Sequence, residues 1–399
     1  MNLKEKNFAQ TTLTFFNDLP IKIQLCVLLS PILLICAYFV STVIFAEYRH
    51  LIDDIIHFAK IGFLSTGLVT IVTPIVCYIA KKFGITDNSN SVKGNVPLLG
   101  GIAIFLSFIA VLFLFKPWTT QMKAILFAGS IIFLIGTLDD IKPLSSLFRL
   151  IGQFSATIIV LSSGLVISFL PQTFSGNAMA YVITFMWIIG VTNAMNFIDG
   201  IDGLASGVTL IASFFFFLIT LHLGQYNVSL LSTVLGGICL GFLFHNFKPA
   251  RIYLGDGGST FLGFMLACVA LYGQWSEKGH VVALGIPILI LGVLVFDMTY
   301  ITISRVKNGS VTNLREWLDY KGLDHFHHRL INLGFKEEQA VIFIYIVCFI
   351  LGISALVLEK SQLAYHVILL ISQATLFFLC ITILMLVGRK KSAEINSRK

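Results

Sequence analysis

Carboxylates and imidazoles follow several of the long apolar runs in this sequence, at positions where a membrane protein normally avoids charge. They are Asp139 and Asp140 in TLDD, Asp199 and Asp202 in NAMNFIDGIDG, Asp256 in LGDGG, and His325, His327 and His328 in HFHHR. Counting the apolar runs places all of them at one face of the membrane. Such a cluster favours metal-dependent chemistry on a phosphorylated substrate at the lipid boundary over a passive structural role.

Asp139 and Asp140 are adjacent, and the cations Lys142 and Arg149 follow them. Two ionised neighbours repel each other, so holding both at a membrane boundary costs free energy unless a metal or cations balance them. A solvated turn is the alternative interpretation. We predict both aspartates as catalytic residues, and Asp139 also as a metal ligand.

Asn193, Asn196, Asp199 and Asp202 recur every third residue, so successive members are neighbours on a helix surface. The glycines among them permit a turn or a close backbone approach. Amide and carboxylate oxygens at this density suit Mg2+, which keeps several waters and shares oxygens with a diphosphate. A helix cap would explain one aspartate only. The pattern therefore predicts the two aspartates as catalytic residues and the two asparagines as substrate ligands.

Asn246 and two cations precede Asp256 in FHNFKPARIYLGDGG, at the mouth of another apolar run. Backbone amides at the start of the following helix are expected to approach phosphate oxygens. Asp256 is then a predicted metal ligand, and Asn246 a predicted substrate ligand. A plain turn is the alternative interpretation of GDGG.

The histidines stand in the long loop 304–339, which also carries several Arg and Lys side chains. Zinc binding is a competing interpretation. No cysteine accompanies the histidines, however, and the surrounding cations would repel a metal ion and attract an anionic diphosphate. The predicted substrate-binding residues of this loop are His325, His327, His328 and Arg329.

The composition defines the class of protein. Of the 399 residues, 57% are hydrophobic, 12% are charged and 36 are phenylalanine, and the mean hydropathy is +0.90. This leaves too little polar surface to cover a water-soluble globule. The seven cysteines lie in apolar runs without paired motifs, so no disulfide or zinc framework is expected. The chain is predicted to be an all-α, polytopic integral membrane protein without a cleaved signal peptide.

A membrane-spanning helix needs about 20 apolar residues, and the sequence contains twelve candidate runs. With the N-terminus in the cytoplasm, most of the 27 Lys and Arg residues fall inside, and every motif loop becomes cytoplasmic. The net charge of +7 then faces anionic lipid, and no nucleic-acid partner is expected. Asp297, inside one run, needs a partner such as Arg305 or another motif residue. The runs are 22–46, 61–80, 98–115, 122–138, 150–170, 178–197, 204–223, 228–246, 258–275, 280–303, 340–358 and 363–388. One membrane domain is expected at 61–390, after an N-terminal segment with an extra span at 1–60 and before a basic tail at 391–399.

The motifs occur in an order that resembles one family. They are PLLGG (97–101), TLDD (137–140), NAMNFIDGIDGLASG (193–207), NFKPARIYLGDGGS (246–259), FDMTYITISRVKNG (296–309) and HFHHRL (325–330). From about residue 61 to 390 this set resembles the polyprenyl-phosphate N-acetylhexosamine-1-phosphate transferase family. PLLGG and HFHHRL are more similar to its undecaprenyl-phosphate GlcNAc-1-phosphate transferase branch than to the phospho-MurNAc-pentapeptide transferases, whose histidine motif resembles HHHFE.

The resemblance implies transfer of a sugar 1-phosphate from a UDP-sugar to undecaprenyl phosphate, with release of UMP, at the cytoplasmic face of the bacterial inner membrane. It implies Mg2+ as the cofactor, with Mn2+ as a second candidate, and leaves a homodimer open. By position, Asp256 matches the family's metal ligand, and Asp139 and Asp140 match the pair that engages the lipid phosphate as base or nucleophile. The other matches are Asn196, Asp199 and Asp202 in the nucleotide motif, His325, His327, His328 and Arg329 in the sugar-nucleotide loop, and Lys93 before PLLGG.

Several alternatives stay open. GlcNAc-1-phosphate is the expected transferred group, and another UDP-N-acetylhexosamine or UDP-MurNAc-pentapeptide is the alternative donor. A cation-coupled transporter is a distant alternative, which would place acidic residues near mid-membrane in broken helices, often with repeat symmetry. Two further hypotheses are that the extra run at 22–46 is an accessory anchor or partner surface, and that the segment 310–324 influences the choice of sugar.

Overall fold

The computed structural model describes residues 49–87, 96–116, 118–167, 173–275, 280–307, 309, 325–361 and 363–397. The chain divides into a first unit, residues 1–57, and a second unit, residues 58–399, which contains every motif. Lys93, the run at 22–46 and the segment 310–324 lie outside the described residues.

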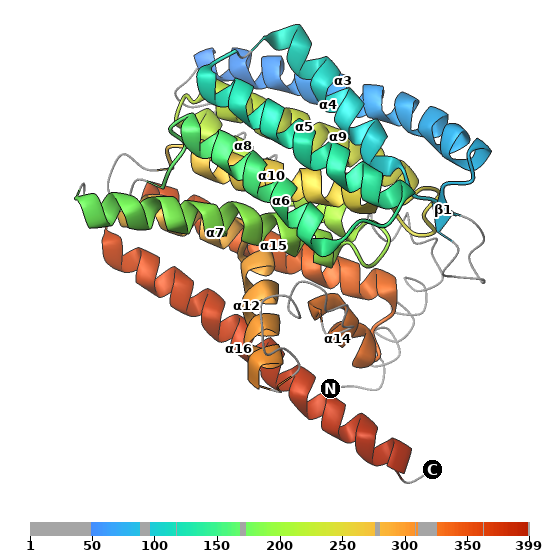
Figure 1. The fold of residues 1–399 in the computed structure, drawn as a ribbon. Coiled ribbons are helices and arrows are strands. Elements are labelled where there is room, and N and C mark those ends of the chain that lie inside the picture. Colours follow the sequence, from blue (N-terminus) through green and yellow to red (C-terminus); the bar gives the residue numbers. More distant parts are fainter. Residues whose placement is uncertain are drawn as a thin grey trace, which may run out of the picture. The chain divides into compact units, whose positions relative to one another are not determined.

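The described residues form helices almost throughout, as the composition predicts (Figure 1). The one sheet among them is a two-residue ladder that pairs β1 with β2 in antiparallel register. The elements are α3 (Arg49–Lys82), β1 (Thr86–Asp87), β2 (Val96–Pro97), α4 (Gly100–Phe115), α5 (Thr120–Ile141), α6 (Ser146–Ser162), α7 (Phe174–Ile198), α8 (Leu204–His222), α9 (Tyr226–Asn246), α10 (Gly255–Tyr272), α11 (His280–Ile290), α12 (Gly292–Lys307), α14 (Phe326–Asn332), α15 (Glu337–Lys360) and α16 (Ala364–Ser397).

The predicted count of twelve spans is higher than the count that the described residues support. Seven of their helices are long and apolar enough to cross a membrane, or eight if α11 and α12 form one span bent by 80°. The helices α4 and α6 are apolar but have only 16 and 17 residues, and α10 begins with the polar GDGG segment. Counting apolar runs in the sequence therefore gave more spans than the described helices support. Some of these runs form helices that are too short to be counted as spans.

Side chains at the helix starts explain where several helices begin. Thr119, Ser145 and Thr173 precede α5, α6 and α7, and each side-chain oxygen accepts a hydrogen bond from the backbone N–H three residues later. Such caps satisfy amides that have no partner within the helix. The bend between α11 and α12 follows Pro287 and falls before Gly292, residue types that accompany sharp helix bends.

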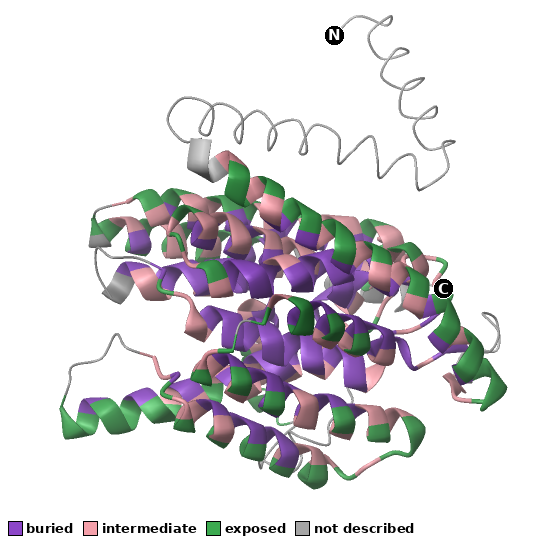
Figure 2. Cartoon of the chain, turned by 90° about the horizontal axis from the view of Figure 1, so that it is seen from above, coloured by how far each residue is buried: buried purple, intermediate pink, exposed green. Residues whose placement is uncertain are grey.

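The helix α10 lies at the centre of the second unit. It contacts α4, α5, α7, α8 and α9, and nearly all of its residues after the first turn are buried. Figure 2 shows buried residues in the middle of the helix stack and exposed residues on its outer sides. Small residues allow the closest approaches, because a Cβ on Gly136 would lie 2.6 Å from the Cα of Gly257. The first turn of α10 is thereby held directly against α5.

Candidate active site

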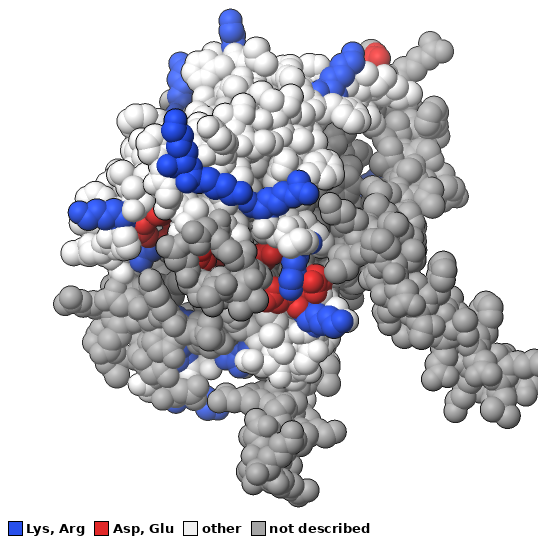
Figure 3. All heavy atoms as spheres, turned by 90° about the vertical axis from the view of Figure 1, so that its right-hand side faces the viewer, with Lys and Arg blue, Asp and Glu red and all other residues white. Residues whose placement is uncertain are grey.

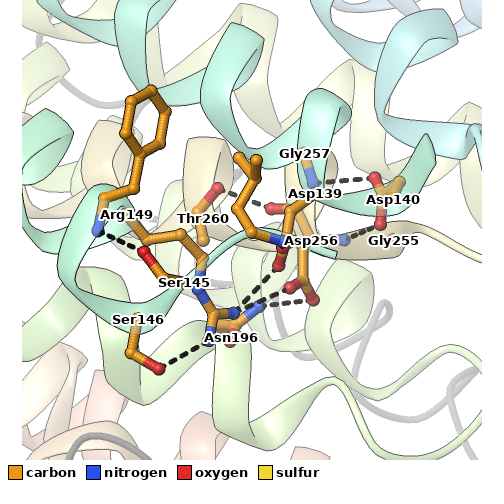
Figure 4. A network of polar contacts seen from close by, with 12 residues as sticks. Asp139, Asp140, Ser145, Ser146, Arg149, Asn196, Gly255, Asp256, Gly257 and Thr260 are labelled. Carbon is orange, nitrogen blue, oxygen red and sulfur yellow. Dashed lines mark hydrogen bonds and ion pairs between the residues drawn. The ribbon is translucent and has the colours of Figure 1, made fainter. Parts of the chain in front are cut away.

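Asp256, in the first turn of α10, has partners from two other helices. Asn196 of α7 donates from Nδ2 to Asp256 Oδ1 at 3.0 Å and to Ser259 Oγ at 2.9 Å. Arg149 of α6 donates from Nη1 to Asp256 Oδ2 at 3.2 Å. Figure 4 shows these side chains pointing toward one another. Two separate motifs, NAMNFIDGIDG and LGDGG, therefore meet at one carboxylate.

The same guanidinium nitrogen of Arg149 also donates to Asp139 Oδ2 at 3.0 Å (Figure 4). Arg149 thus lies between two carboxylates, and the second oxygen of Asp139 accepts from the backbone N–H of Leu144 at 2.5 Å. Sequence analysis identified Arg149 only as a cation that follows TLDD, because residues 107 positions apart carry no signal of contact in the sequence. It is a functional-site residue that sequence reasoning missed.

Asp140 has a different environment from its neighbour. Its two oxygens accept hydrogen bonds from the backbone N–H groups of Asp256 and Gly257, at 2.7 and 3.0 Å. We expected amides at the start of this helix to approach phosphate oxygens. The structure corrects that expectation for these two amides, because a carboxylate from α5 already binds them and supplies the cap that α10 lacks locally.

A small cleft opens beside this network, between α5, α6, α7 and α10. Its floor holds Gln153 and Asn193, whose side-chain amides exchange two hydrogen bonds at 2.8 and 3.2 Å. Asn193 therefore has a protein partner that its motif did not predict. The cleft is lined by Ile132, Ile135, Gly136, Ser146, Arg149, Leu150, Gln153, Asn193, Asn196, Phe197, Asp256 and Thr260. One part of its wall is apolar and the other carries the charged network.

Asp199 ends α7 close to this network. Loss of hydration raises the pKa of its carboxyl well above the usual value, and the charges of Asp256, Asp140 and Asp202 raise it further. The three neighbouring carboxylates carry the same sign of charge as an ionised Asp199 and therefore oppose its ionisation. A bound cation would relieve this repulsion.

Asp202 and Asn246 hold the loop after α7 in place. Asp202 Oδ2 accepts from the backbone N–H of Ala250 at 3.1 Å. Asn246 is buried, accepts from the Gly203 N–H and the Ser206 hydroxyl, and donates to the carbonyl of Ile252. These contacts join the loop that follows α7 to the loop that precedes α10. The catalytic role of Asp202 and the substrate-binding role of Asn246 stay predictions.

The histidine motif lies on the other side of the end of α7. His325 precedes α14, and its ring stacks on Phe197 with the centroids 5.0 Å apart. Its Nδ1 lies 2.9 Å from Asp297 Oδ2. The predicted partner of the buried Asp297 is therefore a motif residue. Because Asn196 contacts Asp256 and the next residue contacts His325, the last turn of α7 joins both halves of the site.

The remaining motif residues of α14 differ in their surroundings. His327 is fully buried, and neither ring nitrogen has a hydrogen-bond partner in the described part of the chain. Burial lowers the pKa of His327 well below its usual value, and the neighbouring His328 and His325 lower it further. Arg329 lies over the Tyr300 ring, 4.7 Å from its centroid, and donates to its hydroxyl at 3.1 Å. The surroundings of His327 therefore favour the neutral form of its ring.

The donor set can be compared with the two metals that the sequence left open. Within the described ranges, no three His, Cys, Asp or Glu side chains are grouped to hold an ion alone. Zinc sites normally need three or four protein ligands, whereas Mg2+ is commonly bound by one or two carboxylates together with waters and substrate phosphates. Asp139 and Asp256, which bracket one guanidinium, are a pair of carboxylates of the kind that would hold Mg2+ together with waters and substrate phosphates.

The charges around the site form a pattern on the surface. Figure 3, which views the molecule from the right-hand side of Figure 1, shows acidic side chains gathered together with Lys and Arg around them. Acidic and basic side chains that lie close together on one face suit a metal ion and anionic substrates. The fold and this site define a polytopic helical membrane protein with a charged network at the ends of its helices.

Comparisons with known proteins identify the family. The family described as Glycosyl transferase family 4 matches residues 122–274. A probable undecaprenyl-phosphate N-acetylglucosaminyl 1-phosphate transferase of Bacillus subtilis (strain 168) is 37% identical over 309 residues, which cover 75% of this chain and 84% of that protein. The chain belongs to glycosyl transferase family 4. The relatives that it matches are polyprenyl-phosphate sugar-phosphate transferases.

Two further relatives show the range of the family. A decaprenyl-phosphate N-acetylglucosaminephosphotransferase of Mycobacterium tuberculosis (strain ATCC 25618 / H37Rv) is 32% identical over 325 residues, 72% of this chain and 79% of that protein. A phospho-N-acetylmuramoyl-pentapeptide-transferase of Streptococcus uberis is 32% identical over 245 residues, 54% of this chain and 73% of that protein. The resemblance read from the ordered motifs is confirmed.

Proposed function

We propose that this protein transfers a sugar 1-phosphate, with GlcNAc-1-phosphate as the first candidate, from a UDP-sugar to undecaprenyl phosphate and releases UMP. The active site is proposed to face the cytoplasm, with Mg2+ as cofactor and Mn2+ as a substitute. The observation that carries the proposal is the network of Asp139, Arg149, Asp256 and Asn196 at the ends of apolar helices. The name of the Bacillus subtilis relative supports this choice of donor and acceptor.

In the proposed reaction, the phosphoanhydride bond between the sugar phosphate and UMP is replaced by one between the sugar phosphate and the lipid phosphate. An oxygen of the acceptor phosphate attacks the phosphorus that carries the sugar, and the bond from that phosphorus to the UMP oxygen breaks. UMP leaves with the bonding electron pair, and the product is a diphosphate-linked lipid. Both substrates are anions, so catalysis depends on charge neutralisation and in-line positioning more than on covalent chemistry. Mg2+, held by Asp139 and Asp256, would neutralise phosphate charge.

The protein groups have separable tasks in this scheme. Asn196 orients the Asp256 carboxylate through its hydrogen bond to Oδ1. Arg149 supplies a permanent positive charge at the mouth of the cleft. Asp140 gives both oxygens to backbone amides of α10, which leaves it poorly placed as a nucleophile. These contacts argue against an aspartyl intermediate on Asp140.

The position of the site agrees with the physical states of the substrates. The acceptor phosphate hangs from an isoprenoid that stays in the bilayer, whereas a UDP-sugar dissolves in the cytosol. Only a site at helix ends is reached by both. The cleft combines an apolar wall of Ile132, Ile135 and Leu150 with the charged network, which suits a lipid that ends in a phosphate.

A cation-coupled transporter would require acidic residues near the middle of the membrane. The proposed catalytic carboxylates lie at helix ends instead, with Asp139 in the last turn of α5 and Asp256 in the first turn of α10. Family membership also favours the transferase. UDP-MurNAc-pentapeptide stays as an alternative donor, because one relative bears the corresponding name.

The test is UMP release by the purified protein with undecaprenyl phosphate, Mg2+ and a panel of UDP-N-acetylhexosamines and UDP-MurNAc-pentapeptide. Turnover with UDP-GlcNAc that needs the metal and is lost in Asp256→Asn would support the proposal. Asp53→Asn, which changes an exposed aspartate in α3, is the matched control and should retain turnover. Preference for another donor would correct the sugar, and no UMP from any donor by a folded protein would contradict the proposal.

A further inference from the structure

A buried aspartate in α12 is tied to the histidine motif by two hydrogen bonds. Asp297 is 1% exposed. Its Oδ2 lies 2.9 Å from His325 Nδ1, and its Oδ1 accepts from the backbone N–H of Phe326 at 2.7 Å. Both partners lie 28 and 29 residues further along the chain. The carboxylate therefore joins the bent helix α12 to the start of α14.

The contact with Phe326 satisfies the start of α14 from outside. His325 is the residue before this helix, and its own side chain makes no capping hydrogen bond. A first-turn N–H without a partner is costly when it is buried, because no water replaces the missing acceptor. Asp297 supplies that acceptor, so it fixes where α14 begins.

The contact with His325 fixes the ring as well. With Oδ1 of Asp297 accepting from the Phe326 N–H, we assign the hydrogen of the second contact to His325 Nδ1, which then donates to Oδ2. The ring is also stacked on Phe197, with an angle of 29° between the planes, and Phe197 lines the cleft beside Asn196 and Asp256. With Nδ1 engaged, Nε2 is the ring nitrogen that remains for a substrate.

We propose that Asp297 is a positioning residue of the active site, which sets the orientation and tautomer of His325 toward the donor diphosphate and anchors α14. The proposal rests on the proposed function, because it names the residue that prepares one of its substrate ligands. Asp297 itself touches no substrate and acts through His325.

The experiment uses a variant that separates anchoring from orientation. In Asp297→Asn, the side-chain oxygen can still accept from Phe326 N–H, but the amide offers N–H to His325. The ring must then accept at Nδ1 and carry its proton on Nε2. Asp297→Ala loses both contacts. Thr299→Ala is the matched control, since Thr299 is an exposed residue of α12 whose hydroxyl donates to the Val295 carbonyl of the same helix.

The first readout is independent of activity. In 15N-histidine-labelled protein, with His325→Gln used for assignment, Asp297→Asn is expected to exchange the protonated and unprotonated nitrogens of His325, whereas Thr299→Ala leaves them unchanged. An unchanged His325 tautomer in Asp297→Asn would overturn the proposal even if the enzyme is inactive toward every donor.

The second readout is kinetic. We expect Asp297→Asn to raise KM for the UDP-sugar by about tenfold or more, as for a lost hydrogen bond to a charged group, with little change in KM for undecaprenyl phosphate. The double variant with His325→Gln should be no worse than His325→Gln alone, because both changes act through one contact. Additive losses, or equal changes in both KM values, would overturn the proposal. Wild-type UMP release in the same assay shows separately whether the proposed function holds.

Discussion

Asp140 of α5 caps α10, because its carboxylate accepts the backbone N–H of Asp256 at 2.7 Å and of Gly257 at 3.0 Å in the first turn of that helix. The side chain of Asp256 remains directed toward Arg149 and Asn196. This is a division of roles between the two neighbouring aspartates of TLDD. Asp139 contacts Arg149, whereas Asp140 binds two backbone amides in the first turn of α10.

This division predicts a stability effect at Asp140. Asp140→Ala removes the acceptor of two backbone amides, and each buried donor left without a partner costs about 1–3 kcal/mol. We expect thermal unfolding of the detergent-solubilised protein at a clearly lower temperature. Asp53→Ala, at an exposed position of α3, serves as the control. An unfolding temperature equal to that of the wild type would refute the capping role.

The position of Arg149 predicts that its replacement strengthens the binding of a divalent cation but weakens catalysis. Its guanidinium contacts the Asp139 and Asp256 oxygens that are proposed to bind a divalent cation, so the two cations compete. Arg149→Gln should bind Mn2+ more tightly, by several-fold in equilibrium titration, although UMP release falls. Lys142→Gln, which removes an exposed cation between α5 and α6, should change Mn2+ affinity much less. Weaker Mn2+ binding by Arg149→Gln would show that the guanidinium supports the metal site instead.

The contact between Gly200 and His327 predicts a requirement for glycine. A Cβ at residue 200 would overlap the His327 ring at Nε2, and that ring is fully buried. Gly200→Ala should therefore displace α14 and lower kcat/KM for the UDP-sugar by at least about tenfold, since overpacking costs about 1–3 kcal/mol. Gly190→Ala is the control, because a Cβ there meets nothing within 4 Å. Equal activities of the two variants would exclude close packing at Gly200.

The lowered pKa of His327 predicts how stability depends on pH. Burial, followed by His328 and His325, keeps this ring neutral in the folded protein. Below a pH of about 6.5 the unfolded chain binds a proton at this residue and the folded protein does not, so stability falls as the pH falls. His327→Gln, which cannot titrate, should lose less stability between pH 7 and pH 5. The measurement is the unfolding temperature across this range, and parallel pH profiles would contradict the prediction.

The sequence predicted the helical membrane class and singled out several carboxylates that the structure brings close together, because both depend on local signals. Apolar length marked the helices, and clustered oxygen donors marked Asp139, Asp199 and Asp256. The contacts between helices carried no such signal. Arg149 and Gln153 stand in ordinary helical positions, and only the packing of α6 against α5 and α7 brings them to the site. The amides of Asp256 and Gly257 looked free for phosphate, because nothing local shows that Asp140 binds them.

The last turn of α7 sets the spacing between the two halves of the site. Asn196 contacts Asp256, and its neighbour Phe197 contacts His325. Consecutive residues of an α-helix point about 100° apart. The helix therefore fixes the angle between the directions of these two side chains. One residue inserted earlier in α7 would rotate both side chains by the same angle about the helix axis. Asn196 would then no longer face Asp256, and Phe197 would no longer face His325, although every motif residue would still be present. The site therefore depends on the helical register of α7 as well as on the identity of its residues.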